Sequence, residues 1–357
     1  MKDQLLSVYS CTLSPFGAAF LEMVIVHAPM QVGELVLASP DLWWRFHCKL
    51  KGFPQQGVPA KVLKRFVRQK KALAQALDNH HPDAIIRVVD TVHTTEECER
   101  LRGQAFVFCA GFPELFKQEV LSAPRLGMVN FHPSYLPRCR GAHPLYWTIA
   151  KREAFGGLSS HFMTTDIDAG PILHRERINF NPELVTYEEL FQLVKQSIPQ
   201  AISTTLQQLS AGRTLPTTEI TETPTYHRND READHGVNWS RDDFATISAK
   251  IRAGQAFVEL GESARLRLEP PLSLHKSGVK FSENASATYL SFEGSDWSFR
   301  SIDGIAFRCD LLPQEFHLWE RIVLRLLRSF PTRRKALMQH IGRRILKAYY
   351  LTQLKSI

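Results

Sequence analysis

Short apolar runs alternate with amphipathic stretches through the first 210 residues of the chain. The apolar runs lie at 5–9, 35–38, 84–89 and 104–110. The stretches with helical spacing lie at 16–26, 62–77, 94–101 and 187–209. This alternation predicts an α/β fold with a Rossmann-like, doubly wound, mostly parallel sheet. Within it we expect 84–89 to be a buried strand and 104–110 a central parallel one.

The pattern changes after residue 212. Thr and Pro crowd the next few residues, as in a linker, and then short runs alternate between apolar and polar positions, which predicts strands. The last segment holds two amphipathic stretches on either side of Pro331. We therefore expect an α/β catalytic domain at 1–212, a linker at 213–245, a smaller β-rich module at 246–312 and a basic amphipathic helical tail at 313–357.

Charge is concentrated at one end of the chain. The whole sequence has a net charge of +8, and residues 313–357 alone hold ten Lys and Arg against two Glu, so residues 1–312 sum to zero. A neutral large domain argues against a DNA-binding or RNA-binding surface there. Three interpretations of the tail stay open: a packing element of a homodimer, a helix lying on a membrane surface, and an RNA-binding segment.

Six scattered cysteines form no Cys-x-x-Cys pair and no metal-binding spacing. We therefore expect reduced thiols, no metal site and a cytoplasmic location. No apolar stretch reaches the roughly 18 residues of a membrane span, and polar residues break the N-terminal apolar run, unlike in a signal peptide. The turn after the first predicted strand holds only Gly17, so no Gly-rich phosphate loop is expected.

The most informative run lies at 128–144. Asn130 and His132 are two positions apart, so on an extended strand they project from the same face. Pro133 lacks the amide hydrogen that a strand interior needs, so the strand should end there. An amide and an imidazole would then stand at the carboxyl end of a strand, where ligands usually bind in open α/β sheets.

A second segment, 157–173, adds a carboxylate. Residues 158–163 predict another strand, and the turn after it carries Asp168 before Gly-Pro. A helix is predicted at 144–151, between His132 and Asp168. A strand–helix–strand unit of this length predicts two parallel strands whose carboxyl ends lie side by side.

Three of these side chains suit transfer of an acyl group to an amine. The Asn130 amide and a protonated His132 can donate hydrogen bonds to a carbonyl oxygen on which charge develops, and one such donor typically lowers the barrier by about 3–4 kcal/mol. Asp168 can orient the imidazole and relay the proton that the amine loses. His161 is expected to be a hydrogen-bonded core histidine, and Asp166 to shape the turn.

The sequence Asn-x-His-Pro-Ser-x-Leu-Pro-x-x-Arg-Gly, followed by Asp-x-Gly-Pro-Ile, resembles the formyltransferase family that uses 10-formyltetrahydrofolate. That family includes methionyl-tRNA formyltransferases, glycinamide ribonucleotide formyltransferases and amino-sugar N-formyltransferases. The resemblance is clear over residues 80–210 and weak over 1–79. It implies a folate-dependent enzyme in which Asn130, His132 and Asp168 are the catalytic residues.

The same resemblance assigns binding roles. Peptide groups and apolar side chains in the loop after 104–110 suit a flat heterocycle such as a pterin. The residues implied to bind 10-formyltetrahydrofolate are Phe112, Pro113, Glu114, Leu115, Phe116, Thr165 and Asp168. The residues implied to bind the amine substrate are Ser134, Arg138, Arg140, Gly141 and Trp147.

The large domain has no net charge, and its segment Pro144-Leu-Tyr146-Trp147 resembles the amino-sugar formyltransferases, which tend to have an aromatic residue there. Both favour a nucleotide-linked amino sugar, a small-molecule amine used for lipopolysaccharide, as the acceptor. We expect a homodimer in the cytoplasm, peripheral to the inner face of the membrane through 313–357. The alternatives are a methionyl-tRNA formyltransferase, formylation of an ornithine-type amine in siderophore synthesis, and a degenerate formyltransferase-fold adaptor. The intact Asn130, His132 and Asp168 favour an enzyme over the adaptor.

Overall fold

The computed structural model describes residues 5–51, 57–214, 220–260, 264–274, 290–293, 296–300, 303 and 305–313. These residues form two compact units. The first unit takes its described residues from 5–148, 153–182 and 188–231, and the second from 149–152, 183–187 and 232 onward. The helices expected at 318–330 and 336–354 lie outside the described residues.

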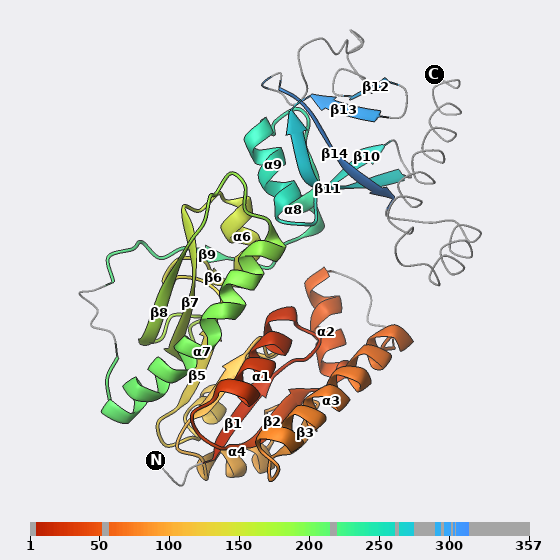
Figure 1. The fold of residues 1–357 in the computed structure, drawn as a ribbon. Coiled ribbons are helices and arrows are strands. Elements are labelled where there is room, and N and C mark those ends of the chain that lie inside the picture. The colour runs from red at the N-terminus through yellow and green to blue at the C-terminus, as the bar shows by residue number, and fades with distance from the viewer. Residues whose placement is uncertain are drawn as a thin grey trace. The chain divides into compact units, whose positions relative to one another are not determined.

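The first unit is built on a seven-stranded sheet of order β3-β2-β1-β4-β5-β7-β8 (Figure 1). The strands are β1 (Leu6–Ser10), β2 (Val32–Ala38), β3 (Ile85–Val89), β4 (Val107–Ala110), β5 (Met128–His132), β7 (Phe155–Phe162) and β8 (Ile172–Asn179). The pairs β3–β2, β2–β1, β1–β4 and β4–β5 are parallel. The strand order reverses at β1–β4, so the predicted doubly wound, mostly parallel α/β sheet is confirmed.

Helices connect most of these strands. They are α1 (Pro15–His27), α2 (Pro40–Lys51), α3 (Ala60–His80), α4 (Thr95–Arg102), α5 (Gln118–Leu121), α6 (Pro144–Ala150) and α7 (Tyr187–Ala211). Side-chain caps fix two of the starts, because Ser14 Oγ accepts a hydrogen bond from the Gly17 amide and Thr94 Oγ1 accepts one from the Glu97 amide. Among the described residues, no helix combines the length and apolar character needed to cross a bilayer.

Two expectations about strands are wrong. Strand β3 is an edge strand rather than a buried one, with Ile85 53% exposed, because it pairs with β2 on one side and with no other described strand. Strand β7 is antiparallel to β5, not parallel, and β8, which the sequence analysis did not predict, is antiparallel to β7. An apolar run identifies a strand, but it encodes neither the strand's direction nor its place in the sheet.

Alternating side chains of the central strands fill two cores. On one face, Phe131 of β5 lies 4.6 Å from Phe20 of α1 and 4.9 Å from Phe108 of β4, measured between ring centroids. On the other face, Tyr9 of β1 packs in a buried cluster with residues of α4 and α5. Members of this second cluster include Val36, Leu101, Cys109, Phe116 and Val120. Because Asn130 and His132 alternate with Phe131, they project from this second face of the sheet.

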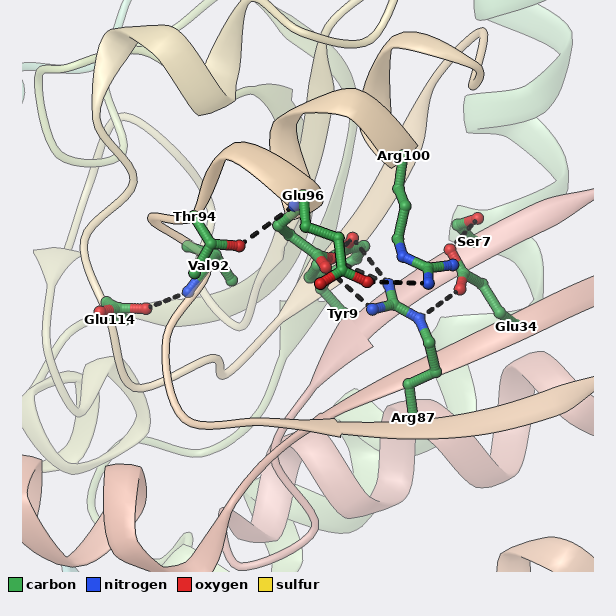
Figure 2. Close-up of polar contacts among 10 residues, drawn as sticks. Ser7, Tyr9, Glu34, Arg87, Val92, Thr94, Glu96, Arg100 and Glu114 are labelled. Carbon is green, nitrogen blue, oxygen red and sulfur yellow. Dashed lines mark hydrogen bonds and ion pairs between the residues drawn. The ribbon is translucent and has the colours of Figure 1, made fainter.

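A polar network lies at the margin of this second core (Figure 2). The Arg87 guanidinium donates two hydrogen bonds to the Glu97 carboxylate, at 2.8 and 2.9 Å, and a third to Glu34 at 2.9 Å. Tyr9 Oη also donates to Glu97. Burial alone would raise the pKa of Glu97, but the bonds from Arg87 and Tyr9 outweigh it and hold the pKa below its usual range.

The described residues of the second unit from 232 onward form two helices and a five-stranded antiparallel sheet of order β10-β11-β14-β13-β12. Its elements are α8 (Glu232–His235), α9 (Phe244–Arg252), β10 (Phe257–Leu260), β11 (Ala264–Leu274), β12 (Leu290–Glu293), β13 (Asp296–Arg300) and β14 (Ala306–Pro313). Asp243 caps α9 by accepting a hydrogen bond from the Thr246 amide. This sheet is the β-rich C-terminal part that the sequence predicted.

We expect Glu97→Gln to destabilise the first unit by about 3 kcal/mol at neutral pH, because the largely buried Arg87 would keep Glu34 but lose the other of its two anionic partners. The Glu97 pKa is lowered by folding, so its contribution is present above the unfolded pKa of about 4.3 and is lost as pH falls below it. Urea unfolding at several pH values would measure both effects.

The matched control is Glu96→Gln, which removes an exposed ion pair with Arg100 on the same helix and should cost less than about 0.5 kcal/mol. Equal losses of unfolding free energy in the two variants would contradict this account. So would a difference in unfolding free energy between wild type and Glu97→Gln that stays the same in acid.

Candidate active site

The site is built on β5. The strand ends at His132, as Pro133 predicted, and its side chains alternate between the α1 face and the opposite face. Phe131 fills the core on the α1 face. The sheet therefore presents Asn130 and His132 together on the other face, as the sequence predicted.

Asp168 reaches these two residues by a different route from the one expected. Strand β7 runs antiparallel to β5, so the loop between β7 and β8 folds back along the strands to bring Asp168 to β5. Asp168 Oδ1 lies 3.3 Å from Asn130 Nδ2, and Asp168 Oδ2 lies 3.5 Å from His132 Nδ1. The three candidate catalytic side chains thus converge, although the predicted parallel arrangement is wrong.

His161 also belongs to this cluster. It is 2% exposed, as a core histidine should be, but its Nε2 lies 3.4 Å from Asp168 Oδ1 and 3.3 Å from Asn130 Nδ2. The pairing of Asn130 with His161 across β5 and β7 causes this proximity. Sequence reasoning missed the contact, because only the antiparallel register places these two residues opposite each other.

Asp168 sits in a strongly polarised position. Its backbone has a φ of 50°, and its Oδ2 accepts a hydrogen bond of 2.9 Å from the Gly141 amide. Burial would raise the Asp168 pKa, but the charges of His132 and His161 and the hydrogen bonds from His161 and Gly141 outweigh it, so the pKa lies well below its usual range. The carboxylate therefore stays ionised at any physiological pH.

His132 is held from both sides. Its Nε2 lies 2.9 Å from the Cys139 carbonyl oxygen, which can only accept, so Nε2 carries a hydrogen there. Its Nδ1 faces the Asp168 carboxylate. The Cys139 thiol itself is buried, and burial raises its pKa, which makes it a poor nucleophile. The ring is thus oriented for proton transfer on its Asp168 side.

Two residues of the turn after β5, Ser134 and Arg138, bind other parts of the protein. Ser134 is buried and its Oγ donates to the Arg138 carbonyl, which closes the turn. The Arg138 side chain pairs with Glu153 and lies 5.1 Å from the centroid of the Phe155 ring. Ser134 and Arg138 thus stabilise the turn through contacts with other protein groups.

Arg140 instead opens into a pocket beside Asp168. This pocket has a volume of about 490 Å³, within the range of about 300–1,000 Å³ typical of small-molecule sites. Its lining residues are Arg140, Thr165, Asp166, Ile167, Ala169, Pro224, Thr225 and Tyr226. Arg140 Nε is buried without a hydrogen-bond partner among the described residues. Arg140 and Thr165, expected to bind different ligands, thus lie in one pocket.

Trp147 anchors the segment after residue 225. Its ring stacks on His227 with centroids 5.0 Å apart, and its Nε1 donates to the Arg228 carbonyl at 3.0 Å. Next to it, β6 (Arg140–Gly141) pairs in parallel with β9 (Tyr226–His227). Trp147 is 7% exposed, so in this structure it packs the segment that forms one wall of the pocket.

In the loop after β4, the Glu114 side chain is hydrogen-bonded within the protein. The Glu114 carboxylate accepts a hydrogen bond of 2.8 Å from the Val92 amide (Figure 2). It accepts another of 2.8 Å from Thr91 Oγ1. Phe112 and Phe116 pack toward Tyr9, and Pro113 is buried. Leu115 is 71% exposed, although its carbonyl accepts from His93 Nε2 at 2.9 Å. The loop therefore presents an apolar side chain on a rigid backbone.

Comparisons with known proteins show what this chain is similar to. Residues 93–206 match the family model described as formyl transferase. The methionyl-tRNA formyltransferase of Clostridium botulinum (strain Alaska E43 / Type E3) is 31% identical over 137 residues, which are 38% of this chain and 44% of that protein. The chain spans about half the length of the curated relatives it matches.

Solved structures share the fold. An N-formyltransferase from Helicobacter canadensis superposes with a TM-score of 0.53 at 15% identity, covering 87% of this chain and 99% of that one. A sugar N-formyltransferase from a Shewanella species gives a TM-score of 0.52 at 14% identity, covering 76% and 99%. These superpositions show that the chain shares the α/β fold of those proteins. Residues 93–206, the part of the chain that matches the formyl transferase model, include Asn130, His132 and Asp168.

We expect Gly141→Ala to destabilise the site by about 3 kcal/mol. Gly141 has a φ of 94°, and an added Cβ would overlap the His227 carbonyl oxygen, so β6 and β9 would separate. Hydrogen exchange should accelerate at the Arg140 and Ala142 amides, which bond to the segment of β9.

Gly212→Ala is the matched control, because Gly212 also has a positive φ, of 63°, but no atom lies within 4 Å of its added Cβ. It should cost only the backbone strain, about 1–2 kcal/mol, and leave the two amides unchanged. If the two variants behave alike, the close packing of Gly141 on β9 has no energetic role.

Proposed function

We propose that this protein is a folate-dependent N-formyltransferase that moves a formyl group from 10-formyltetrahydrofolate to a primary amine. The observation that carries the proposal is the convergence of Asn130, His132 and an ionised Asp168 within 3.5 Å at the end of β5. Such a cluster supplies a hydrogen-bond donor, a titratable ring and a fixed negative charge, which are the groups that acyl transfer to an amine needs.

Two structural neighbours and the loop at 112–116 support 10-formyltetrahydrofolate as the formyl donor. The neighbour from Helicobacter canadensis was solved with folinic acid, and a further neighbour, HypX from Aquifex aeolicus, with tetrahydrofolic acid. In this chain the residues that would hold the folate are those of the loop 112–116, together with Thr165 and Asp168. The exposed Leu115 and the stiff backbone around it suit one face of a heterocycle. When bound, the folate supplies the activated formyl group.

Each catalytic side chain has a role in the proposal. Asn130 Nδ2 makes only long contacts of 3.3 Å, so it is free to shorten a hydrogen bond to an oxygen on which charge grows. Asp168 stays negative and stabilises positive charge on the His132 ring or on the attacking nitrogen. His132 accepts or passes the proton that the amine loses. Gly141 and His161 hold the Asp168 carboxylate in place.

For the amine we propose a nucleotide-linked amino sugar used in lipopolysaccharide synthesis. The Helicobacter canadensis neighbour was solved with dTDP-3-aminofucose, and it covers 87% of this chain. The pocket at Arg140 lies beside Asp168, has the volume of a small-molecule site and offers a guanidinium, which suits a phosphate or another anionic group. This chemistry matches a nucleotide sugar better than it matches a neutral amine.

A second candidate function has its own support. Methionyl-tRNA formyltransferases are the curated relatives with 31% and 32% identity to this chain. Those matches cover 38% and 45% of this chain. The proposal further includes a homodimer located in the cytoplasm and touching the inner face of the membrane through 313–357.

We expect Asn130→Ala to lower kcat about 100- to 1,000-fold, because one donor to the developing charge is lost, while tetrahydrofolate binding measured by calorimetry changes little. Gln207→Ala, which removes an exposed amide from α7, should leave kcat unchanged. No tetrahydrofolate binding by the wild type would instead support the adaptor alternative, and an active Asn130→Ala would remove Asn130 from the catalytic group.

The acceptor is tested by competition between substrates. With labelled 10-formyltetrahydrofolate, we expect transfer to a dTDP-linked or UDP-linked amino sugar and none to charged initiator tRNA. Arg140→Ala should raise KM for the nucleotide sugar at least tenfold with a smaller change in kcat, because the pocket would lose its cation. Transfer to charged initiator tRNA and not to an amino sugar would make methionyl-tRNA formyltransferase the favoured function.

A further inference from the structure

Helix α3 (Ala60–His80) carries a surface that the catalytic site does not use. Between Asp41 and Asp78 the chain contains nine Lys and Arg and no Asp or Glu. This segment lies before residue 93, where the match to the family model begins. Residues 1–312 sum to zero charge. Acids elsewhere in the chain therefore balance a strongly basic segment.

The structure arranges these cations along one side of the helix. Val62, Phe66, Leu73 and Leu77 form the buried side. Exposed cations recur every three or four positions, at 61, 64 and 65, 68 and 71, so they form a row along the opposite side. They are Lys61, Lys64, Arg65, Arg68 and Lys71. At about 1.5 Å per residue, the row from Lys61 to Lys71 is on the order of 15 Å long.

None of these five cations is neutralised within the described part of the protein. No hydrogen bond or ion pair joins them to another described residue, whereas exposed Arg100 and Lys195 each have an acidic partner. Solvated helix surfaces usually mix both signs of charge, often as pairs one turn apart. A row of a single sign over five unpaired side chains therefore indicates an anionic partner.

Two exposed aliphatic residues identify the kind of partner. Leu63 is 43% exposed and Val67, one turn further along, is 65% exposed. By helical geometry both lie along one edge of the cation row, between it and the buried side of the helix. Phosphodiesters of RNA offer such side chains no contact, but the boundary between lipid headgroups and acyl chains receives both cations and aliphatic groups.

We propose that α3 is a membrane-docking surface that binds anionic phospholipids, with the cation row on the headgroups and Leu63 and Val67 entering the boundary below them. The side of α3 away from the sheet, in the orange part of the ribbon next to α1, would face the bilayer (Figure 1). A docked enzyme would work beside a lipid surface without any spanning segment. This proposal does not depend on which amine the site accepts.

The test is cosedimentation of the full chain with vesicles of phosphatidylcholine containing about 30 mol% phosphatidylglycerol, against pure phosphatidylcholine. We expect binding to the anionic vesicles only, weakening with salt. The triple variant Lys64→Glu, Arg68→Glu, Lys71→Glu should bind about a hundredfold more weakly, since each cation near an anionic surface contributes about a fivefold factor.

A control with the same change in net charge uses three exposed arginines elsewhere on the first unit: Arg102→Glu, Arg125→Glu and Arg213→Glu. It should weaken binding by no more than a few fold. The tail 313–357 is unchanged in every protein, so its contribution cancels. Thermal unfolding checks that both triple variants are folded.

The aliphatic pair separates a bilayer from other polyanions. Leu63→Ser with Val67→Ser should weaken vesicle binding about tenfold and leave binding to heparin unchanged. Equal vesicle binding by the two charge-reversal variants would overturn the proposal. Tighter binding of the wild type to duplex RNA than to vesicles, lost in the α3 reversal, would also overturn it and make α3 an RNA surface.

Discussion

An ionised carboxylate enclosed by donors is the interaction on which this site depends. Asp168 is largely shielded from water, and an isolated buried carboxylate would be protonated rather than charged. It keeps its charge because two imidazoles and the Gly141 amide surround it. Each of these partners imposes a requirement on the chain, so the geometry of the loop, the turn and the β5–β7 register all follow from one charge.

The requirement on the turn is the most restrictive. The Gly141 amide that bonds to Asp168 belongs to a residue with a φ of 94°, and the His227 carbonyl oxygen of β9 occupies the place where a Cβ would stand. Trp147 holds that strand by stacking on His227. Residues that a family motif assigns to substrate binding, such as Ser134 and Arg138, have structural contacts here. A motif around an active site thus records the scaffold that holds the catalytic groups as well as the groups themselves.

The sequence predicted the parts of the site that depend on local periodicity. Alternation along β5 placed Asn130 and His132 on one face, and Pro133 gave the end of the strand. It could not predict that β7 is antiparallel, because a run of apolar residues is the same in either direction. The contact of His161 with Asp168 follows from that direction and was therefore missed. The buried network of Arg87 with Glu97 was missed for a similar reason, since it joins β3 to α4 by packing alone.

Net charge was the least reliable of the sequence arguments, because a sum over 312 residues removes the information about where charges lie. The same residues that sum to zero include a helix with five unpaired cations on its outer side. The neutral total was used against a tRNA substrate, but a polyanion responds to the local field within about a Debye length, roughly 8–10 Å, and not to the total. The choice between an amino sugar and tRNA therefore rests on the Arg140 pocket and on what α3 binds. An α3 that prefers lipid leaves the pocket as the place where the acceptor is selected.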